Sequence, residues 1–217
     1  MLLVASGTVA VRDGDRTAFT AAGTVPPAPA ASPTPRAQPP RPVRVGASRP
    51  YPAPRRTGIA AAGIRPDASF VPDRVRVAAL GLDAPVVRES VDDGGALALP
   101  EDPRTVGWWG AGAAPGAPLG TIVLAGHVDS EQQGAGALFP LARTPVGARV
   151  VLSGPGGDAS YVVQARRRFA KDDLPWRDLF RQDVGARLLL VTCGGEFNPA
   201  TRHYTDNVVV YAVPTAT

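Results

Sequence analysis

Hydrophobic residues from about position 73 onward occur in short runs rich in β-branched side chains. The alternation in "RVRVAAL" predicts a strand that begins at Arg74, because successive side chains of a strand point to opposite faces. The other runs that we assign to strands are "APVVRE", "GALALP", "TIVLAG", "ARVVLSG", "ASYVVQARRRF", "ARLLLVTC" and "DNVVVYAV". Glycine, proline and aspartate separate them, as in a β-sandwich or β-barrel. We therefore predict an all-β domain, with brief helices only in "GALFPLART" and "LPWRDLFRQD".

The N-terminal third has a different composition. Residues 25–56 contain eleven prolines and no acidic residue, which predicts a disordered, extended, polyproline-like segment. The start, "MLLVASGTVAV", is apolar but shorter than the roughly 20 residues that span a bilayer. We assign residues 1–24 to a possible remnant of a membrane anchor, 25–66 to a Pro/Arg-rich linker or stalk, and 67–217 to the β-domain. The alternative interpretation of the Pro/Arg-rich segment is a disordered tail that has no role.

Charge is distributed unevenly along the chain. The net charge is +4, but residues 1–66 carry nine Arg and two Asp, whereas residues 67–217 carry fourteen Lys or Arg and seventeen Asp or Glu. A nucleic-acid-binding domain places its positive charge on the folded part, so we expect no nucleic-acid partner. The basic stalk favours anionic lipids or cell-wall polyanions instead. The sequence has no metal-ligating cluster or phosphate-binding loop, so we expect no cofactor or metal.

Three residues are candidates for chemistry. Cys193 is the only cysteine, and it ends an apolar run just before two glycines. His127 ends another run directly after Gly126. Each alone is more often a structural residue, but strand ends are where a barrel presents functional groups. Arg202 follows Cys193 by nine residues and is suited to hydrogen bonding an oxyanion.

These residues resemble the sortases, which are cysteine transpeptidases of Gram-positive cell surfaces. The resemblance rests on "AGH" at 125–127 and "LLVTC" at 189–193, and it extends over residues 73–213. The segment "TCGGEFNPATRHYTDNVVVYA" is most similar to class E/F sortases of high-GC bacteria. The resemblance implies a closed eight-stranded β-barrel. It also implies that Cys193 is the nucleophile, His127 its partner and Arg202 the cation, and that Thr192, Asp129 and Asn207 support them.

The implied activity is cleavage of an LPxTG-like sorting signal through a thioester, followed by transfer to a cell-wall amine. Such an enzyme works as a monomer at the extracellular face of the plasma membrane. The position of the cation stays open, because Asn207 is nearest in register to the family's arginine and one of Arg166 to Arg168 is another candidate. His203 is a competing imidazole, for which we expect a packing role. Another cysteine hydrolase or transpeptidase, or a non-enzymatic surface domain with an inert Cys193, are the alternative functions.

Overall fold

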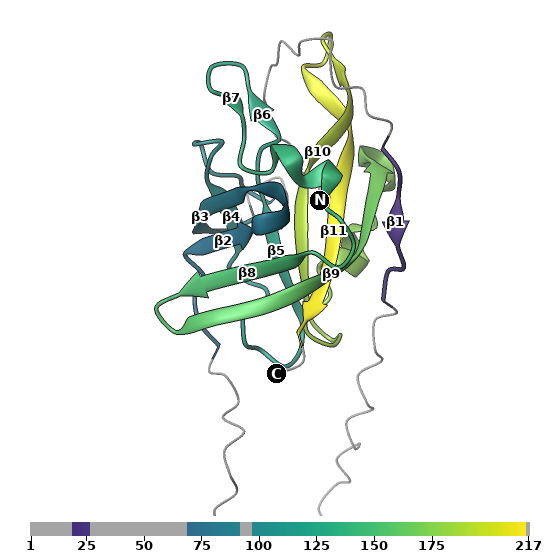
Figure 1. The fold of residues 1–217 in the computed structure, drawn as a ribbon. Coiled ribbons are helices and arrows are strands. Elements are labelled where there is room, and N and C mark those ends of the chain that lie inside the picture. The colour runs from purple at the N-terminus through teal and green to yellow at the C-terminus, as the bar shows by residue number, and fades with distance from the viewer. Residues whose placement is uncertain (1–18, 27–68, 92–96, 216–217) are drawn as a thin grey trace, which may run out of the picture.

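The computed structural model of the chain describes residues 19–26, 69–91 and 97–215 (Figure 1). The expected stalk therefore lies outside the described residues from position 27 to 66, as does the apolar start over residues 1–18. In the part of the chain that the structure describes, no helix is both long and apolar enough to cross a membrane.

Eight strands close into a barrel. Their order is β9-β11-β10-β5-β4-β3-β2-β8, and β8 pairs back with β9 to close the ring. Two neighbouring pairs, β5 with β10 and β3 with β4, are parallel, and the others are antiparallel. The expected closed, eight-stranded all-β barrel is thus confirmed. The strands are β2 Arg74–Val77, β3 Leu82–Glu89, β4 Val106–Trp109, β5 Thr121–Ala125, β8 Arg149–Gly154, β9 Gly157–Ala170, β10 Arg187–Asn198 and β11 His203–Pro214.

Short elements decorate the barrel. The hairpin of β6 (Asp129–Ser130) and β7 (Gly134–Ala135) projects from the same end as the β10–β11 hairpin (Figure 1). The brief helices are η1 Ala78–Leu80, η2 Phe139–Arg143, η3 Lys171–Asp173 and α1 Trp176–Leu179. The prediction of a strand in "GALALP" is wrong for residues 97–100, the part of this segment that the structure describes. Only Leu97 forms an isolated bridge, because Pro100 has no N–H for a ladder and the leucines pack on the barrel wall instead.

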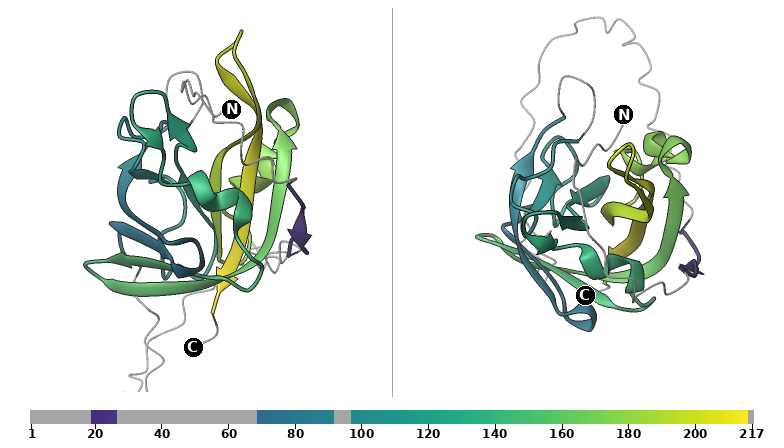
Figure 2. Two further views of the ribbon diagram at one scale, coloured as in Figure 1. Left: turned by 45° about the horizontal axis from the view of Figure 1, so that its top comes forward. Right: turned by 90° about the horizontal axis from the view of Figure 1, so that it is seen from above.

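Strands β10 and β11 are buried on both faces, which explains their continuous apolar sequences. Leu188, Leu190 and Val210 face the barrel interior. Leu189, Val209 and their neighbours on the outer face pack under the segment that holds η3 and α1. Figure 2 shows this side of the barrel, in yellow and green, opposite the blue side formed by β2 and β3. The outer face of β10 and β11 is therefore a second core.

An N-terminal strap, residues 19–26, lies against β9. Its strand β1 (Ala22–Gly23) pairs with Ala165 and Arg166 of β9, although this part of the sequence had been assigned to the possible anchor. The Arg166 guanidinium donates a hydrogen bond to the Thr20 carbonyl oxygen at 2.7 Å. The Phe19 ring lies 5.1 Å from the Arg166 guanidinium, within cation–π range. The strap thus covers the edge of β9 that the closed barrel leaves unpaired.

Candidate active site

Cys193 and His127 are brought together by the parallel pairing of β10 with β5. The register runs from Arg187 opposite Thr121 to Val191 opposite Ala125, so paired residues are always 66 positions apart. Cys193 and His127 have the same separation and lie two positions beyond the last pair of this ladder, after Thr192 and Gly126. Neighbouring strands lie about 4.8 Å apart. The register, continued by these two residues, therefore directs the two side chains that the sequence singled out to corresponding positions at one end of the barrel.

Buried side chains fasten this strand pair at both ends. At the far end, Nε of Arg187 donates to Oγ1 of Thr121 at 2.9 Å, and both residues are buried. At the near end, the Thr192 hydroxyl donates to the carbonyl oxygen of Gly126 at 2.8 Å. Thr192 and Gly126 directly precede Cys193 and His127. The Thr192 hydrogen bond therefore holds the relative position of the candidate pair.

The His127 ring is oriented by a backbone carbonyl. Its Nε2 lies 3.0 Å from the carbonyl oxygen of Pro100. A carbonyl oxygen only accepts hydrogen bonds, so Nε2 carries the proton and donates it. Nδ1 is then the nitrogen that is left to exchange a proton. This contact also gives a role to the irregular segment that contains Pro100, since it fixes the tautomer of His127.

The Cys193 thiol is enclosed. The residue is 4% exposed. Burial raises the pKa of the Cys193 thiol above its ordinary value, while the Lys171 ammonium opposes the rise and the Asp129 carboxylate adds to it. The thiol form is therefore favoured in this conformation. A reaction at sulfur requires a change in its surroundings that admits a substrate and stabilises the thiolate.

Asp129 is bonded to Tyr204 across two hairpins. The Tyr204 hydroxyl donates to Oδ2 of Asp129 at 2.5 Å. Burial raises the pKa of Asp129, and the hydrogen bond from Tyr204 and the charge of His127 act against the rise. Asp129 lies in β6, and it does not cap η2, which begins ten residues later. Its Oδ1 is buried without a hydrogen-bond partner among the described residues.

Asn207 lies directly opposite Cys193 on β11. It is 2% exposed, and its side-chain Oδ1 has no hydrogen-bond partner in the described part of the chain. The residue that the sequence placed nearest in register to the family's arginine is thus the residue opposite the thiol on β11.

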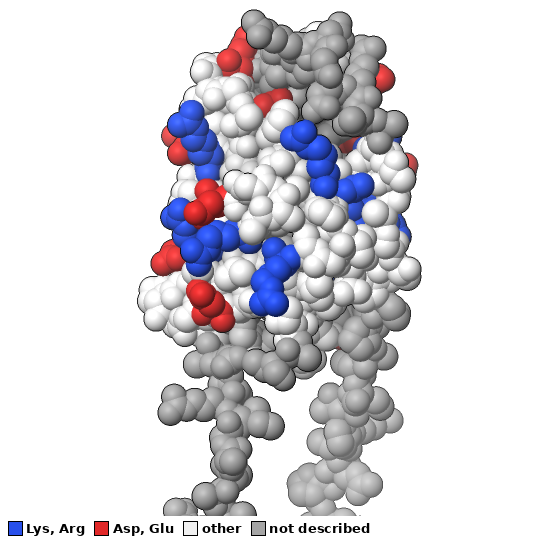
Figure 3. Space-filling view, viewed as in Figure 1, with Lys and Arg blue, Asp and Glu red and all other residues white. Residues whose placement is uncertain are grey.

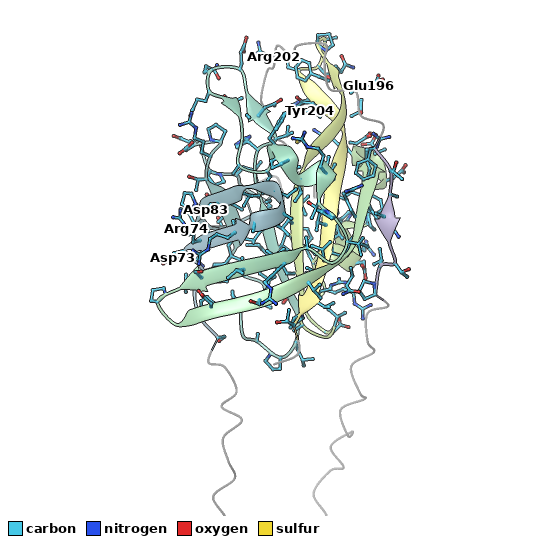
Figure 4. All side chains as sticks on the ribbon, in the orientation of Figure 1. Asp73, Arg74, Asp83, Glu196, Arg202 and Tyr204 are labelled. Carbon is cyan, nitrogen blue, oxygen red and sulfur yellow. The ribbon has the colours of Figure 1, made fainter. Side chains whose placement is uncertain are left out.

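Arg202 is at the turn that joins β10 to β11. Figure 4 shows it with Tyr204 at the end of the barrel where the two hairpins project. Its guanidinium forms an exposed ion pair with Glu131 at 3.0 Å. Arg202 has a φ of 57° and precedes Asn207 by five residues, or about 16 Å along an extended strand. The structure thus puts Arg202 on the same side of the barrel as Cys193, but engaged with the β6–β7 hairpin.

The other candidate arginines and His203 contact other parts of the molecule than Arg202 does. Arg166 and Arg167 donate hydrogen bonds to the N-terminal strap, and Arg168 forms an ion pair with Asp206 at 3.1 Å. His203 begins β11 and pairs with Asn198, away from the position of Cys193. On the face in Figure 3, Lys and Arg alternate with Asp and Glu instead of forming one basic patch. Among the described residues, no group of three His, Cys, Asp or Glu side chains is placed to hold a metal ion.

The closed eight-stranded barrel, with a cysteine and a histidine carried on neighbouring parallel-paired segments, is the fold of a known family. A family model described as "Sortase domain" matches residues 75–215, and the chain belongs to the sortase family. Sortases are transpeptidases, so the chain is an enzyme of this type.

Solved sortase structures share the fold. Sortase A of Corynebacterium diphtheriae, a lid mutant, has a TM-score of 0.53 and 15% identity over 69% of this chain and 72% of its own. Sortase C-1 of Actinomyces oris has a TM-score of 0.51 and 17% identity over 66% of this chain and 73% of its own. Sortase C1 of Streptococcus agalactiae, in complex with MTSET, has a TM-score of 0.50 and 22% identity over 67% and 71%. A search of curated protein sequences gives no match.

Sequence reasoning missed three neighbours of the candidate pair. The sequence does not mark Pro100 as a site residue, because every residue has a backbone carbonyl. It does not mark Lys171 either, because a single lysine is usually a surface residue. Tyr204 could not be linked to the site from the sequence, because its partner Asp129 is 75 positions away. These contacts arise from how hairpins and loops meet above the barrel end.

Proposed function

We propose that this sortase cleaves an LPxTG-like sorting signal and transfers the product to an amine of a cell-wall precursor. The observation that carries the proposal is the β5–β10 register, which leads to His127 and Cys193 at one end of the barrel and is held there by the hydrogen bond from Thr192 to Gly126. A thiol beside an imidazole supplies both a nucleophile and a proton donor for the leaving amine.

The reaction begins when the Cys193 thiol gives its proton to Nδ1 of His127. The thiolate attacks the carbonyl carbon of the Thr-Gly peptide bond, a C–S bond forms, and the carbonyl π electrons move to oxygen. The intermediate then collapses, the C–N bond breaks, and the imidazolium protonates the departing amine. A thioester remains on Cys193. An incoming amine attacks it, forms a new amide bond and releases the thiol.

Arg202 is proposed as the cation that steadies the carbonyl oxygen during these steps. In the structure its guanidinium is paired with Glu131. That ion pair is exposed, and such pairs contribute only about 0–1 kcal/mol to stability. Thr192, Asp129 and Asn207 are proposed as supporting residues.

We further propose a class E/F subtype and a location at the extracellular face of the plasma membrane. The subtype rests on the sequence after Cys193, and the location on the sorting-signal substrate. Anionic lipids or wall polyanions are proposed to bind the basic segment before the barrel, and the enzyme is proposed to act as a monomer.

The test is incubation of the protein with an LPxTG-type peptide and an amine acceptor. Mass spectrometry should detect a thioester on Cys193 and the transpeptidation product. A Cys193→Ala variant should give neither. A wild-type protein that forms no acyl-enzyme with a panel of sorting-signal peptides, and whose folded thiol does not react with iodoacetamide, would instead support the inert surface domain.

A further inference from the structure

Asn207 is a buried carboxamide in an apolar environment. On β11, Asn207 shares a face with Val209 and Tyr211, which belong to the outer core. Its partner on β9 is Phe169, another residue of that cluster. A leucine or valine would be expected at such a position, so the polar side chain calls for an explanation.

The amide of Asn207 is not used by the fold. Its Oδ1 is buried and has no hydrogen-bond partner in the ranges that the structure describes. An unpaired buried polar group destabilises a protein, and such groups concentrate where a ligand supplies the missing bond. A rotation of 180° about the Cβ–Cγ bond of Asn207 exchanges the positions of Oδ1 and the NH₂ group. Oδ1 has no hydrogen bond to lose in that rotation.

The unpaired amide lies beside the thiol. Cys193 and Asn207 are direct partners in the antiparallel β10–β11 ladder. Side chains of directly opposed residues lie on the same face with Cβ atoms about 4.5–5.5 Å apart. An amide at this distance can reach an oxygen on a carbon bonded to the sulfur. On the other side of Cys193, the β5–β10 register, continued two residues beyond its last pair, places His127 at the corresponding position.

We propose that Asn207 is a further catalytic residue, whose NH₂ group donates a hydrogen bond to the carbonyl oxygen of the peptide bond that Cys193 attacks. This inference rests on the proposed function. As the C–S bond forms, the carbonyl oxygen gains negative charge, and the hydrogen bond from Asn207 strengthens. When the C–N bond breaks, the charge returns to the carbonyl and the hydrogen bond weakens. No proton leaves Asn207 at any step.

Asn207 and Arg202 then have separate tasks. In the structure Arg202 is paired with Glu131, whereas Asn207 is directly opposite Cys193. A neutral amide also adds no charge that would disturb the resting thiol. The amide is therefore the donor that is in place before the substrate arrives.

The test compares Asn207→Leu with the wild-type protein in single-turnover acylation by a saturating LPxTG-type peptide. Removing one oxyanion donor lowers such a rate by about 10²–10³, and the KM for peptide should change much less. The melting temperature should stay the same or rise, because leucine fills a similar volume without an unpaired polar group. Asn207→Ser serves as a second variant if the leucine variant does not fold.

Tyr211→Phe is the matched control, because it also removes a buried polar group from the same face of β11. Its acylation rate should equal that of the wild type. Acylation of Asn207→Leu at the wild-type rate would overturn the inference and leave the proposed function intact. A parallel fall of acylation and melting temperature would overturn it too, by giving Asn207 a structural role. A wild-type protein that forms no thioester would overturn both.

Discussion

The Tyr204 hydroxyl donates a 2.5 Å hydrogen bond to Oδ2 of Asp129, and both groups are close enough to Cys193 to be electrostatically coupled to it. Burial raises the pKa of Tyr204, and the Asp129 carboxylate raises it further. The phenol therefore remains a hydrogen-bond donor over the working pH range. Two hairpins that are distant in sequence thus place a buried anion beside the thiol.

The charges around the thiol should move its pKa in opposite directions. Lys171→Met removes a cation that lowers the pKa of Cys193, so that pKa should rise. Asp129→Asn removes an anion that raises it, so the pKa should fall. The pH profile of iodoacetamide alkylation measures both shifts, and Lys171→Arg, which keeps the charge, should resemble the wild type. Shifts in the same direction for the two charge-removing variants would contradict this electrostatic account.

Asp129 should also make stability depend on pH. Because burial raises its pKa, the folded state binds the Asp129 proton more tightly than the unfolded chain does. Stability is then lost as the pH rises from about 3.9, the ordinary aspartate value, through the raised folded pKa. Asp129→Asn keeps an acceptor for Tyr204 but does not titrate. Urea unfolding measures the free energy of unfolding of Asp129→Asn and of the wild type. The value for the variant minus that for the wild type should therefore increase between pH 4 and pH 7, and a constant difference would refute the assignment.

Cys193→Ala and His127→Ala should each abolish transpeptidation without unfolding the barrel. Cys193 lies within β10 and His127 follows the end of β5, and neither is one of the large interior hydrophobic side chains whose truncation costs about 2–5 kcal/mol. Product formation is followed by mass spectrometry and folding by circular dichroism. Near wild-type turnover in either variant would show that the site lies elsewhere.

Arg202→Ala should lower kcat by about 10²–10³ and change KM much less, because the proposed contact strengthens in the transition state. Arg202→Lys should restore only part of the rate, since lysine lacks the planar fork of donors. Glu131→Gln is the informative control. It releases Arg202 from its ion pair and should not slow the reaction, whereas a loss equal to that of Arg202→Ala would mean that the ion pair itself is what matters.

Gly23→Ala should release the N-terminal strap. Gly23 has a φ of 77°, and a Cβ there would lie 1.9 Å from the backbone oxygen of Gln164. The left-handed conformation alone costs an alanine about 1–2 kcal/mol. Limited proteolysis should then cut within residues 19–26 more rapidly. Gly134→Ala, with a φ of 75° and no atom within 4 Å, has the strain without the clash and should leave the strap resistant.

The strands and the candidate pair could be predicted because each depends on local sequence. The apolar run that ends at Cys193 is buried on both faces, and such runs are visible in a sequence. The order of the strands in the barrel does not follow from local sequence, since the parallel pairing of β5 with β10 depends on residues far apart in the chain.

Contacts made by short or polar segments could not be predicted. The strand Ala22–Gly23 has no strand-like pattern, and it forms because β9 offers an unpaired edge and two arginines. The residues of "GALALP" looked like a strand, but their leucines pack on the outer core. This segment resembles a strand in its hydrophobicity. Hydrophobicity alone does not show whether a segment pairs with a neighbouring strand or packs its side chains against the sheet.

The fixed offset between β5 and β10 has a consequence for protein engineering. The distance between His127 and Cys193 is set by the ladder and not by the chain that connects them. A peptide inserted in an exposed turn of that connection, away from Lys171 and the outer core, should therefore leave the spacing of the pair unchanged. The turn between Gly154 and Gly157, which joins β8 to β9, is the natural place for an affinity tag or a fluorescent reporter.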